Sequence, residues 1–144
     1  MSANEGVELL VAKTWLVTTL RADATLAALG IHERRRPPGA TGIVGVVRLL
    51  DPGLNTNALG GSHILARPTF LVEFCYQGSA DDPLAPYVIL AHSLVNKQRG
   101  LVPALGGEIF SCIRLRSFEQ TEFEAATEWR RLGNVYQLGV GNAS

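Results

Sequence analysis

Hydrophobic positions repeat with two different periods along the chain, and this pattern predicts two packed helices. Residues 5–21 place Val, Leu and Ala in a broad helical stripe rather than in strict alternation, which is typical of a helix lying on a sheet. A second helix is expected between Asp81 and Gly100, because two acidic residues and Pro83 precede apolar residues at helical spacing. A short apolar turn over 26–29 should follow the first helix.

Alternation with a period of two predicts the strands. Residues 42–50 are rich in Val and Ile, and the alternating stretch 64–76 is expected to form a central strand. The alternating stretches 108–116 and 128–140 flank a predicted turn, which favours a terminal hairpin. Arms of a dozen or more residues, at about 3.3 Å per residue, would each reach roughly 40 Å, which is longer than the core needs. We therefore expect the charged middle, 116–131, to project.

This order of elements predicts an α+β fold with a mostly antiparallel sheet, two packed helices and a long projecting C-terminal β-hairpin. The length of 144 residues and the absence of repeats indicate one domain over 1–144. Residues 50–61 have no hydrophobic period, so they should form a long loop that is either functional or a contact surface for another subunit.

The charge of the chain narrows the classes of function that the protein could have. Thirteen Lys and Arg residues balance thirteen Asp and Glu residues, which argues against a protein that holds nucleic acid by bulk electrostatics. Charged residues make up 18%, below the average of about 25%, so we expect other subunits to cover much of the surface. No stretch has the apolar length of a signal peptide or a membrane span, so the expected protein is soluble and has no membrane partner.

Candidate catalytic and ligand-binding chemistry is sparse. Cys75 and Cys112 each lie in an apolar alternating stretch, which favours reduced core cysteines over a nucleophile paired with histidine. Residues 39–45 are rich in glycine but lack the ending of a phosphate-binding loop and precede a strand. Metal binding has little support because no histidine has a second ligand at helical spacing; the three are His32, His63 and His92. We therefore predict no catalytic residue, metal, cofactor or enzymatic activity.

The charges that remain suggest contacts with other chains. The one basic run, followed by two prolines, could contact a phosphate or an acidic partner, or be a solvated strand end. The expected arm carries charges of both signs, which suit a neighbour with complementary charges or a solvated tip, whereas it lacks the apolar walls of a catalytic pocket. The candidate interface residues are Arg34, Arg35, Arg36, Arg114, Arg116, Glu119, Glu122, Glu124, Glu128 and Trp129.

Two segments carry a resemblance to a known family. The sequence resembles the small tail terminator, or tail completion, proteins of long-tailed bacteriophages and related prophage elements. The likeness is in Ala-Thr-Leu-Ala-Ala-Leu-Gly over 24–30, and in Trp-Arg-Arg-Leu-Gly-Asn-Val-Tyr-Gln-Leu-Gly-Val over 129–140. It extends over nearly the whole chain in the order and spacing of elements.

The resemblance implies a hexameric ring at the head-proximal end of the phage tail, where it stops growth of the tail tube and joins the tail to the head connector. The implied partners are further copies of the chain, the tail tube protein and a head–tail connector or stopper protein. DNA would pass through the lumen without sequence-specific binding. The implied location is the tail or neck of the virion, assembled in the host cytoplasm. Such a ring needs two different complementary patches on each subunit.

Two other functions stay open at this point. One is a neighbouring head–tail connector or stopper component of the same size and architecture. The other is a small soluble ligand-binding module or enzyme, in which the 50–61 loop and the helix over 83–100 would frame a pocket. A monomer with a deep apolar pocket near Tyr87 and His92 would favour this second reading.

Overall fold

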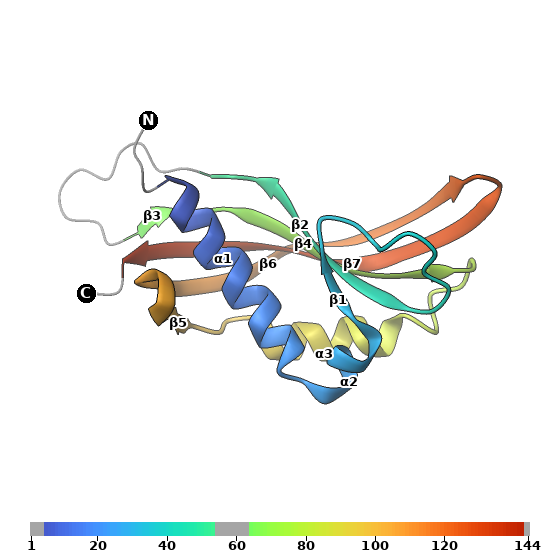
Figure 1. Ribbon diagram of the computed structural model, residues 1–144, viewed down its shortest axis with the longest axis horizontal. Coiled ribbons are helices and arrows are strands. Elements are labelled where there is room, and N and C mark those ends of the chain that lie inside the picture. The colour runs from blue at the N-terminus through green and yellow to red at the C-terminus, as the bar shows by residue number, and fades with distance from the viewer. Residues whose placement is uncertain (1–4, 54–63, 143–144) are drawn as a thin grey trace.

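The computed structural model describes residues 5–53 and 64–142, so most of the expected 50–61 loop, and His63, lie outside the described residues. The helices are α1 (Glu5–Arg21), α2 (Ala24–Leu29) and α3 (Ala85–Val95), with a 3-10 turn η1 (Pro103–Leu105). The strands are β1 (Ile31–Glu33), β2 (Val44–Asp51), β3 (Ile64–Ala66), β4 (Thr69–Gln77), β5 (Gly100–Val102), β6 (Gly107–Glu124) and β7 (Thr127–Asn142). The fold is α+β, as the sequence predicts (Figure 1).

The described strands form one sheet in the order β1-β2-β4-β7-β6-β5, with β3 also pairing with β7. Strands β1 and β2 run parallel, and the other neighbours are antiparallel. The main core lies between the helices and one face of this sheet, where α1 and α3 contribute side chains such as Leu16, Leu20 and Val95. They pack against Phe70 and Phe74 of β4, which is central as expected.

The segment after α1 forms a short helix where the sequence predicts only an apolar turn. The carboxylate of Asp23 accepts hydrogen bonds from the backbone N–H groups of Thr25 (2.9 Å) and Leu26 (3.1 Å), which is a standard N-terminal cap. Gly30, with a φ of 92°, ends the helix at a conformation that few other residues adopt. The chain then enters β1 directly.

Helix α3 is shorter than expected, because the chain reverses soon after Val95 instead of continuing to Gly100. Lys97 has a φ of 62°, and its backbone N–H donates to the carbonyl oxygen of Cys112 on β6 at 2.6 Å. This turn delivers β5 to the edge of β6, where Gly100 pairs with Ile109. The sequence analysis did not predict β5 or the 3-10 turn.

The expected single strand over 64–76 is two strands, and Pro68 stands between them. Proline has no backbone N–H to donate to a neighbouring strand, so the pairing breaks there. Strand β3 pairs with the end of β7, and β4 pairs with β7 further along. The carbonyl oxygen of Pro68 still accepts a hydrogen bond from the N–H of Leu138 at 3.0 Å, which keeps the chain on the sheet through the break.

The predicted C-terminal hairpin is present as β6 and β7, and it extends beyond the core as a curved arm (Figure 1). Strand β6 continues to Glu124, past the expected end at Arg116, and the two strands stay paired up to Glu124 and Thr127. Ala125 and Ala126 form the turn with φ values of 50° and 67°. Two successive positive φ values match the twist of a two-residue hairpin turn.

Candidate functional site

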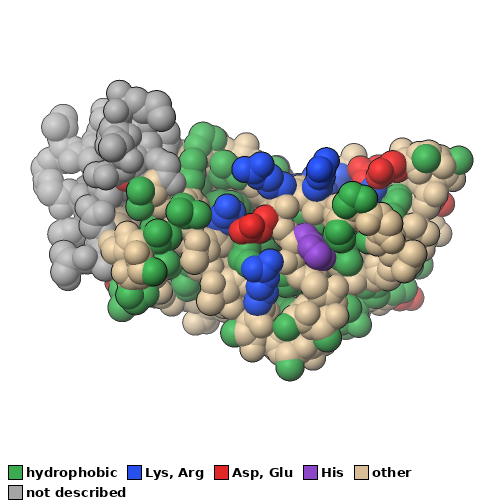
Figure 2. Space-filling model, in the orientation of Figure 1, with side chains coloured by type: hydrophobic (Ala, Val, Ile, Leu, Met, Phe, Trp, Pro, Cys, Tyr) green, Lys and Arg blue, Asp and Glu red, His purple; other side chains and the backbone are tan. Residues whose placement is uncertain are grey.

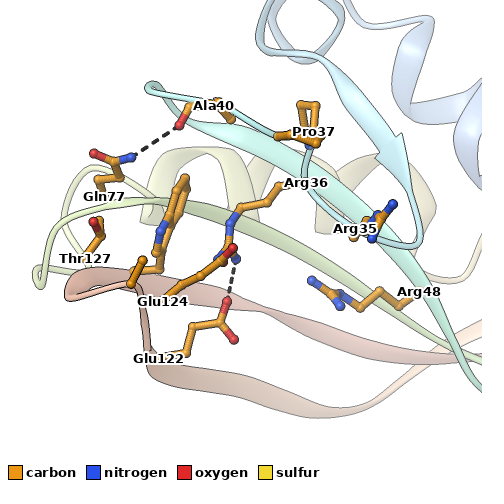
Figure 3. A pocket seen from close by; sticks show the side chains of 13 residues that line it. Arg35, Arg36, Pro37, Ala40, Arg48, Gln77, Glu122, Glu124 and Thr127 are labelled. Atoms are coloured by element: carbon orange, nitrogen blue, oxygen red, sulfur yellow. Dashed lines mark hydrogen bonds and ion pairs between the residues drawn. The ribbon is translucent and has the colours of Figure 1, made fainter.

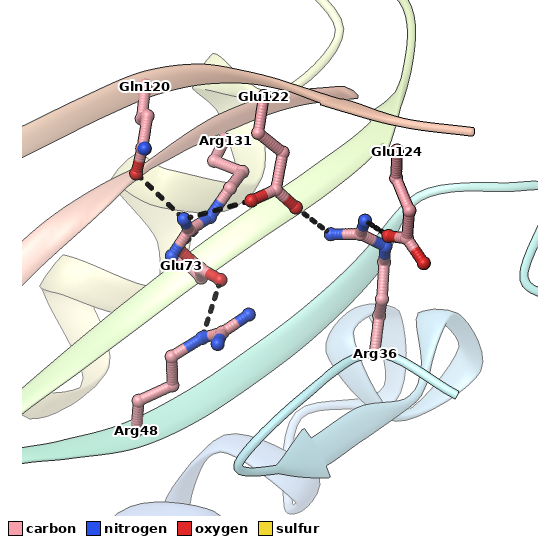
Figure 4. A network of polar contacts seen from close by, with 7 residues as sticks. All are labelled: Arg36, Arg48, Glu73, Gln120, Glu122, Glu124 and Arg131. Atoms are coloured by element: carbon pink, nitrogen blue, oxygen red, sulfur yellow. Dashed lines mark hydrogen bonds and ion pairs between the residues drawn. The ribbon is translucent and has the colours of Figure 1, made fainter. Parts of the chain in front are cut away.

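A network of alternating charges lies on the sheet face opposite the helices, and its centre is Glu73 of β4 (Figure 4). This carboxylate is 0% exposed. It accepts hydrogen bonds from Nε of Arg48 on β2 at 3.0 Å and from Nε of Arg131 on β7 at 2.9 Å. Both of its oxygens therefore have a cationic partner, which a buried carboxylate requires.

The network continues from the sheet into the hairpin arm. Arg131 donates through Nη1 to Gln120 at 2.7 Å and lies 3.5 Å from the carboxylate of Glu122. Arg36 reaches across from the loop after β1, bonds Oε1 of Glu122 at 2.5 Å and also pairs with Glu124. Positive and negative groups thus alternate from Arg48 to the end of β6, as Figure 4 shows.

These contacts keep the charged forms stable. Burial alone would raise the pKa of Glu122, but the hydrogen bond from Arg36 and the charge of Arg131 lower it. Burial opposes the charge of Arg36, whereas its hydrogen bond to Glu122 and the charge of Glu124 raise the pKa of the guanidinium. The pKa of Glu122 is lower in the folded chain than in the unfolded chain. Its contacts therefore stabilise the fold above the ordinary carboxyl pKa, and this stabilisation is lost as the pH falls through the lowered pKa.

Aromatic rings accompany the two arginines that hold the arm. The guanidinium carbon of Arg36 lies 3.9 Å from the ring centre of Trp129, and that of Arg131 lies 5.0 Å from the ring centre of Phe118. These distances suit cation–π attraction. Trp129 is buried in a small apolar cluster with Cys75 on this face, so the arm has its own packed base.

A second set of ion pairs holds the arm from the helix side. Arg130 of β7 donates to Asp81, just before α3, at 2.5 Å through Nε and at 3.3 Å through Nη2. It also binds Glu119 at 3.0 Å and Thr121 at 3.0 Å. The hydrogen bond from Arg130 lowers the pKa of Asp81. The base of the arm is therefore braced on both faces of the sheet.

A cavity of about 450 Å³ opens beside this network (Figure 3). Its walls come from the loop 35–40, from Arg48 and Gln77, and from the end of the hairpin with Glu122 and Trp129. The side chains of Arg35 and Arg48 both extend toward it (Figure 3). Its lining mixes charged side chains of both signs with apolar ones, so it lacks the predominantly apolar walls of a typical small-ligand pocket.

The remaining candidates for chemistry in the described chain are metal-binding clusters and the two thiols. Over 5–53 and 64–142, no group of three or more His, Cys, Asp or Glu residues could hold a metal ion. Cys75 lies against the network, and burial together with the charge of Glu73 raises the pKa of its thiol to about 11. Burial also raises the pKa of the Cys112 thiol to about 12. Within the described ranges, no helix is long and apolar enough to cross a membrane.

We expect both thiols to resist labelling in the folded chain. Reagents such as dithionitrobenzoate attack the thiolate, and the raised pKa values leave almost none of it near pH 8.5, the ordinary pKa of a thiol. Absorbance should show no fast labelling of the native chain and two thiols per chain after unfolding in guanidinium. Rapid labelling of the native chain would show that at least one cysteine is accessible and reactive.

The groove beside His92 is smaller than the deep pocket that a ligand-binding module would need. It measures about 230 Å³, lies between α3 and the base of the hairpin, and is lined by residues that include Ile89 and Leu132 but not Tyr87. Nδ1 of His92 lies 2.9 Å from the hydroxyl of Tyr136. Burial and the charge of Arg114 lower the pKa of His92. The ring is therefore half-buried and has a hydrogen-bonding partner in Tyr136.

The structure divides the expected interface residues into two sets. Arg36 pairs with Glu122 and Glu124, and Glu119 pairs with Arg130, so these charges meet within one chain instead of forming separate basic and acidic patches. Trp129 is buried at the base of the arm. The other set makes no ion pair among the described residues and consists of Arg34, Arg35, Arg114, Arg116 and Glu128.

Sequence reasoning missed Arg48, Glu73 and Arg131 as a connected set. A signal was present, because Glu73 is the one charge in the apolar strand 69–76, and a lone charge in such a strand needs a partner from a neighbouring strand. The alternation placed Glu73 on the same face as Cys75, but it did not show which arginines face it.

Comparisons with known proteins show a likeness in fold. No protein-family model matches the chain, and no curated protein matches it in sequence. A chain of the solved structure described as "Virion of native gene transfer agent (GTA) particle" is similar over 99% of this chain and 100% of that chain, with a TM-score of 0.63 and 18% sequence identity. The two chains therefore share a fold from end to end.

Proposed function

We propose that this chain is a structural, non-enzymatic protein of a phage-like virion, in which it forms a ring at the head-proximal end of the tail. The observation that carries the proposal is the end-to-end fold likeness to a chain of a gene transfer agent virion. The resemblance to tail terminators in sequence pattern points to the same class.

The braced hairpin supports this role. A ring subunit must present fixed surfaces to its neighbours, and the ion pairs of Arg36, Arg130 and Arg131 hold the arm to the core from both sides. The charges left without an ion pair in the described chain, such as Arg35 and Arg116, are then available to neighbouring chains. A closed ring uses two different patches of this kind on each subunit.

As a tail terminator, the chain would act as one domain over 1–144 and close into a ring, with six copies as the expected number. One face of the ring would bind the tail tube protein and stop its polymerisation. The other would bind a head–tail connector or stopper protein, and DNA would pass through the lumen without being read. The chain would therefore reside in the tail or neck of the virion after assembly in the host cytoplasm.

Negative-stain electron microscopy of the purified chain, alone and mixed with tail tube protein, tests this role. We expect rings, and we expect tubes that carry a ring at one end and stop growing. Rings that bind the portal or head-completion proteins but never a tube would favour the connector role instead. A chain that stays monomeric at high concentration and with tube protein present would contradict the proposal.

A further inference from the structure

The tip of the arm carries the most exposed large hydrophobic side chain of the described residues. Phe123 is 73% exposed, so most of its ring is in contact with water. It lies directly across the hairpin from Glu128, so the two side chains share one face. Glu128 makes no ion pair within 5–53 and 64–142. The tip thus presents an aromatic ring beside a free carboxylate.

A groove with the complementary chemistry lies between α1 and β2. It measures about 330 Å³, and its floor and walls are apolar, from Leu9, Leu10, Val47, Leu49 and Phe70. Leu10 and Leu49 are 40% and 44% exposed, so the groove has apolar surface still open to water. Its rim carries two cations, Lys13 and Arg34.

The hairpin tip lies at one end of the longest axis of the molecule, whereas α1, which forms one wall of the groove, lies on the other side of the middle (Figure 1). The surface view has Lys and Arg side chains gathered along its upper centre and acidic side chains toward the hairpin end (Figure 2). Two complementary patches at separate places on one subunit suit a contact that repeats from head to tail.

We propose that Phe123 of one copy inserts into the groove between α1 and β2 of a second copy, and that Glu128 pairs with Arg34 at the groove's rim. This contact rests on the proposed ring and specifies which surfaces close it. The groove beside α3 fits less well, because it offers Arg114 as its only cation and lies at the base of the hairpin itself.

Single variants of the two patches test the contact. Phe123→Ser and Leu49→Ser should each weaken it about 10- to 100-fold, the equivalent of one buried apolar side chain. The matched control is Ile89→Ser, since Ile89 is 69% exposed but lies in the other groove. Analytical ultracentrifugation gives the assembly constants, and thermal unfolding confirms that each variant is folded.

Mixing two variants, and exchanging the charges of Arg34 and Glu128, makes the test specific for the proposed contact. Phe123→Ser and Leu49→Ser chains each keep one intact patch, so a mixture should form heterodimers but no rings. Arg34→Glu and Glu128→Arg should each weaken assembly, and the double variant should restore it.

Two results would overturn the contact while the proposed ring remains supported. In one, the wild type forms rings and the Phe123→Ser variant assembles equally well. In the other, the wild type forms rings and only the Ile89→Ser variant loses assembly. A wild-type chain that is monomeric at every concentration would overturn both.

Discussion

Replacing Glu73 with alanine is expected to lower the free energy of unfolding by about 3–5 kcal/mol, the range for removing one partner of a buried ion pair. Arg131 is buried and Arg48 is half-buried, and both point their guanidinium groups at this carboxylate. Without it, Arg48 has no counter-charge among the described residues, and Arg131 keeps only Glu122 at 3.5 Å. Urea unfolding followed by circular dichroism measures the change.

The matched control is Glu124→Ala, which removes a carboxylate from the exposed end of the same network. An exposed ion pair contributes at most about 1 kcal/mol, so this variant should unfold close to the wild type. Glu73→Gln should lie between the two, because its amide can still accept one hydrogen bond. A Glu73→Ala variant as stable as the Glu124→Ala variant would show that water or other groups satisfy the two arginines.

Adding one methyl group at Gly133 should destabilise the fold by about 3 kcal/mol, near the upper end of the range for overpacking a core. Gly133 lies in β7, between β4 and β6, where the backbones approach closely. A Cβ there would overlap the carbonyl oxygen of Val72 and lie 2.7 Å from Cα of Glu73. Backbone atoms cannot rotate away as a side chain can, so β4 must separate from β7.

Gly42→Ala is the control for this substitution, because a Cβ at Gly42 meets no atom within 4 Å. Its thermal unfolding temperature should stay within about 2 °C of the wild type, a shift of well under 1 kcal/mol. The Gly133→Ala variant should unfold many degrees lower, or fail to accumulate as folded protein. Equal unfolding temperatures for the two variants would contradict the close approach of β4 and β7.

The hydrophobic pattern was enough to predict the class of fold and the terminal hairpin. Each depends on a local period that one stretch of chain carries by itself, as in α1 and in β4. The errors lie where a single residue overrides the period. Pro68 splits one expected strand by withholding an N–H, and Asn96 ends a helical stretch by adopting an extended conformation. Neither effect changes the pattern of apolar residues around it.

The charge network was harder to predict, because its pairs are distant in sequence. Arg36 and Glu122 are 86 positions apart, and only the order of strands in the sheet brings them together. In the sequence, both residues are candidates for contacts with other chains. The order of strands in the sheet is not visible in the sequence. A charged residue that pairs within the chain therefore looks the same in the sequence as one that pairs with another chain.

The two sets of ion pairs at the base of the arm also affect the rate of assembly and its cost in free energy. An arm that was flexible in the free subunit would lose conformational entropy on docking, at roughly 0.5–1.5 kcal/mol for each long side chain that becomes ordered. Here Arg36 and Arg130 fix the arm before any neighbour arrives. The free subunit is thus preorganised for association, and high salt, by weakening these partly exposed pairs, would slow assembly without unfolding the core.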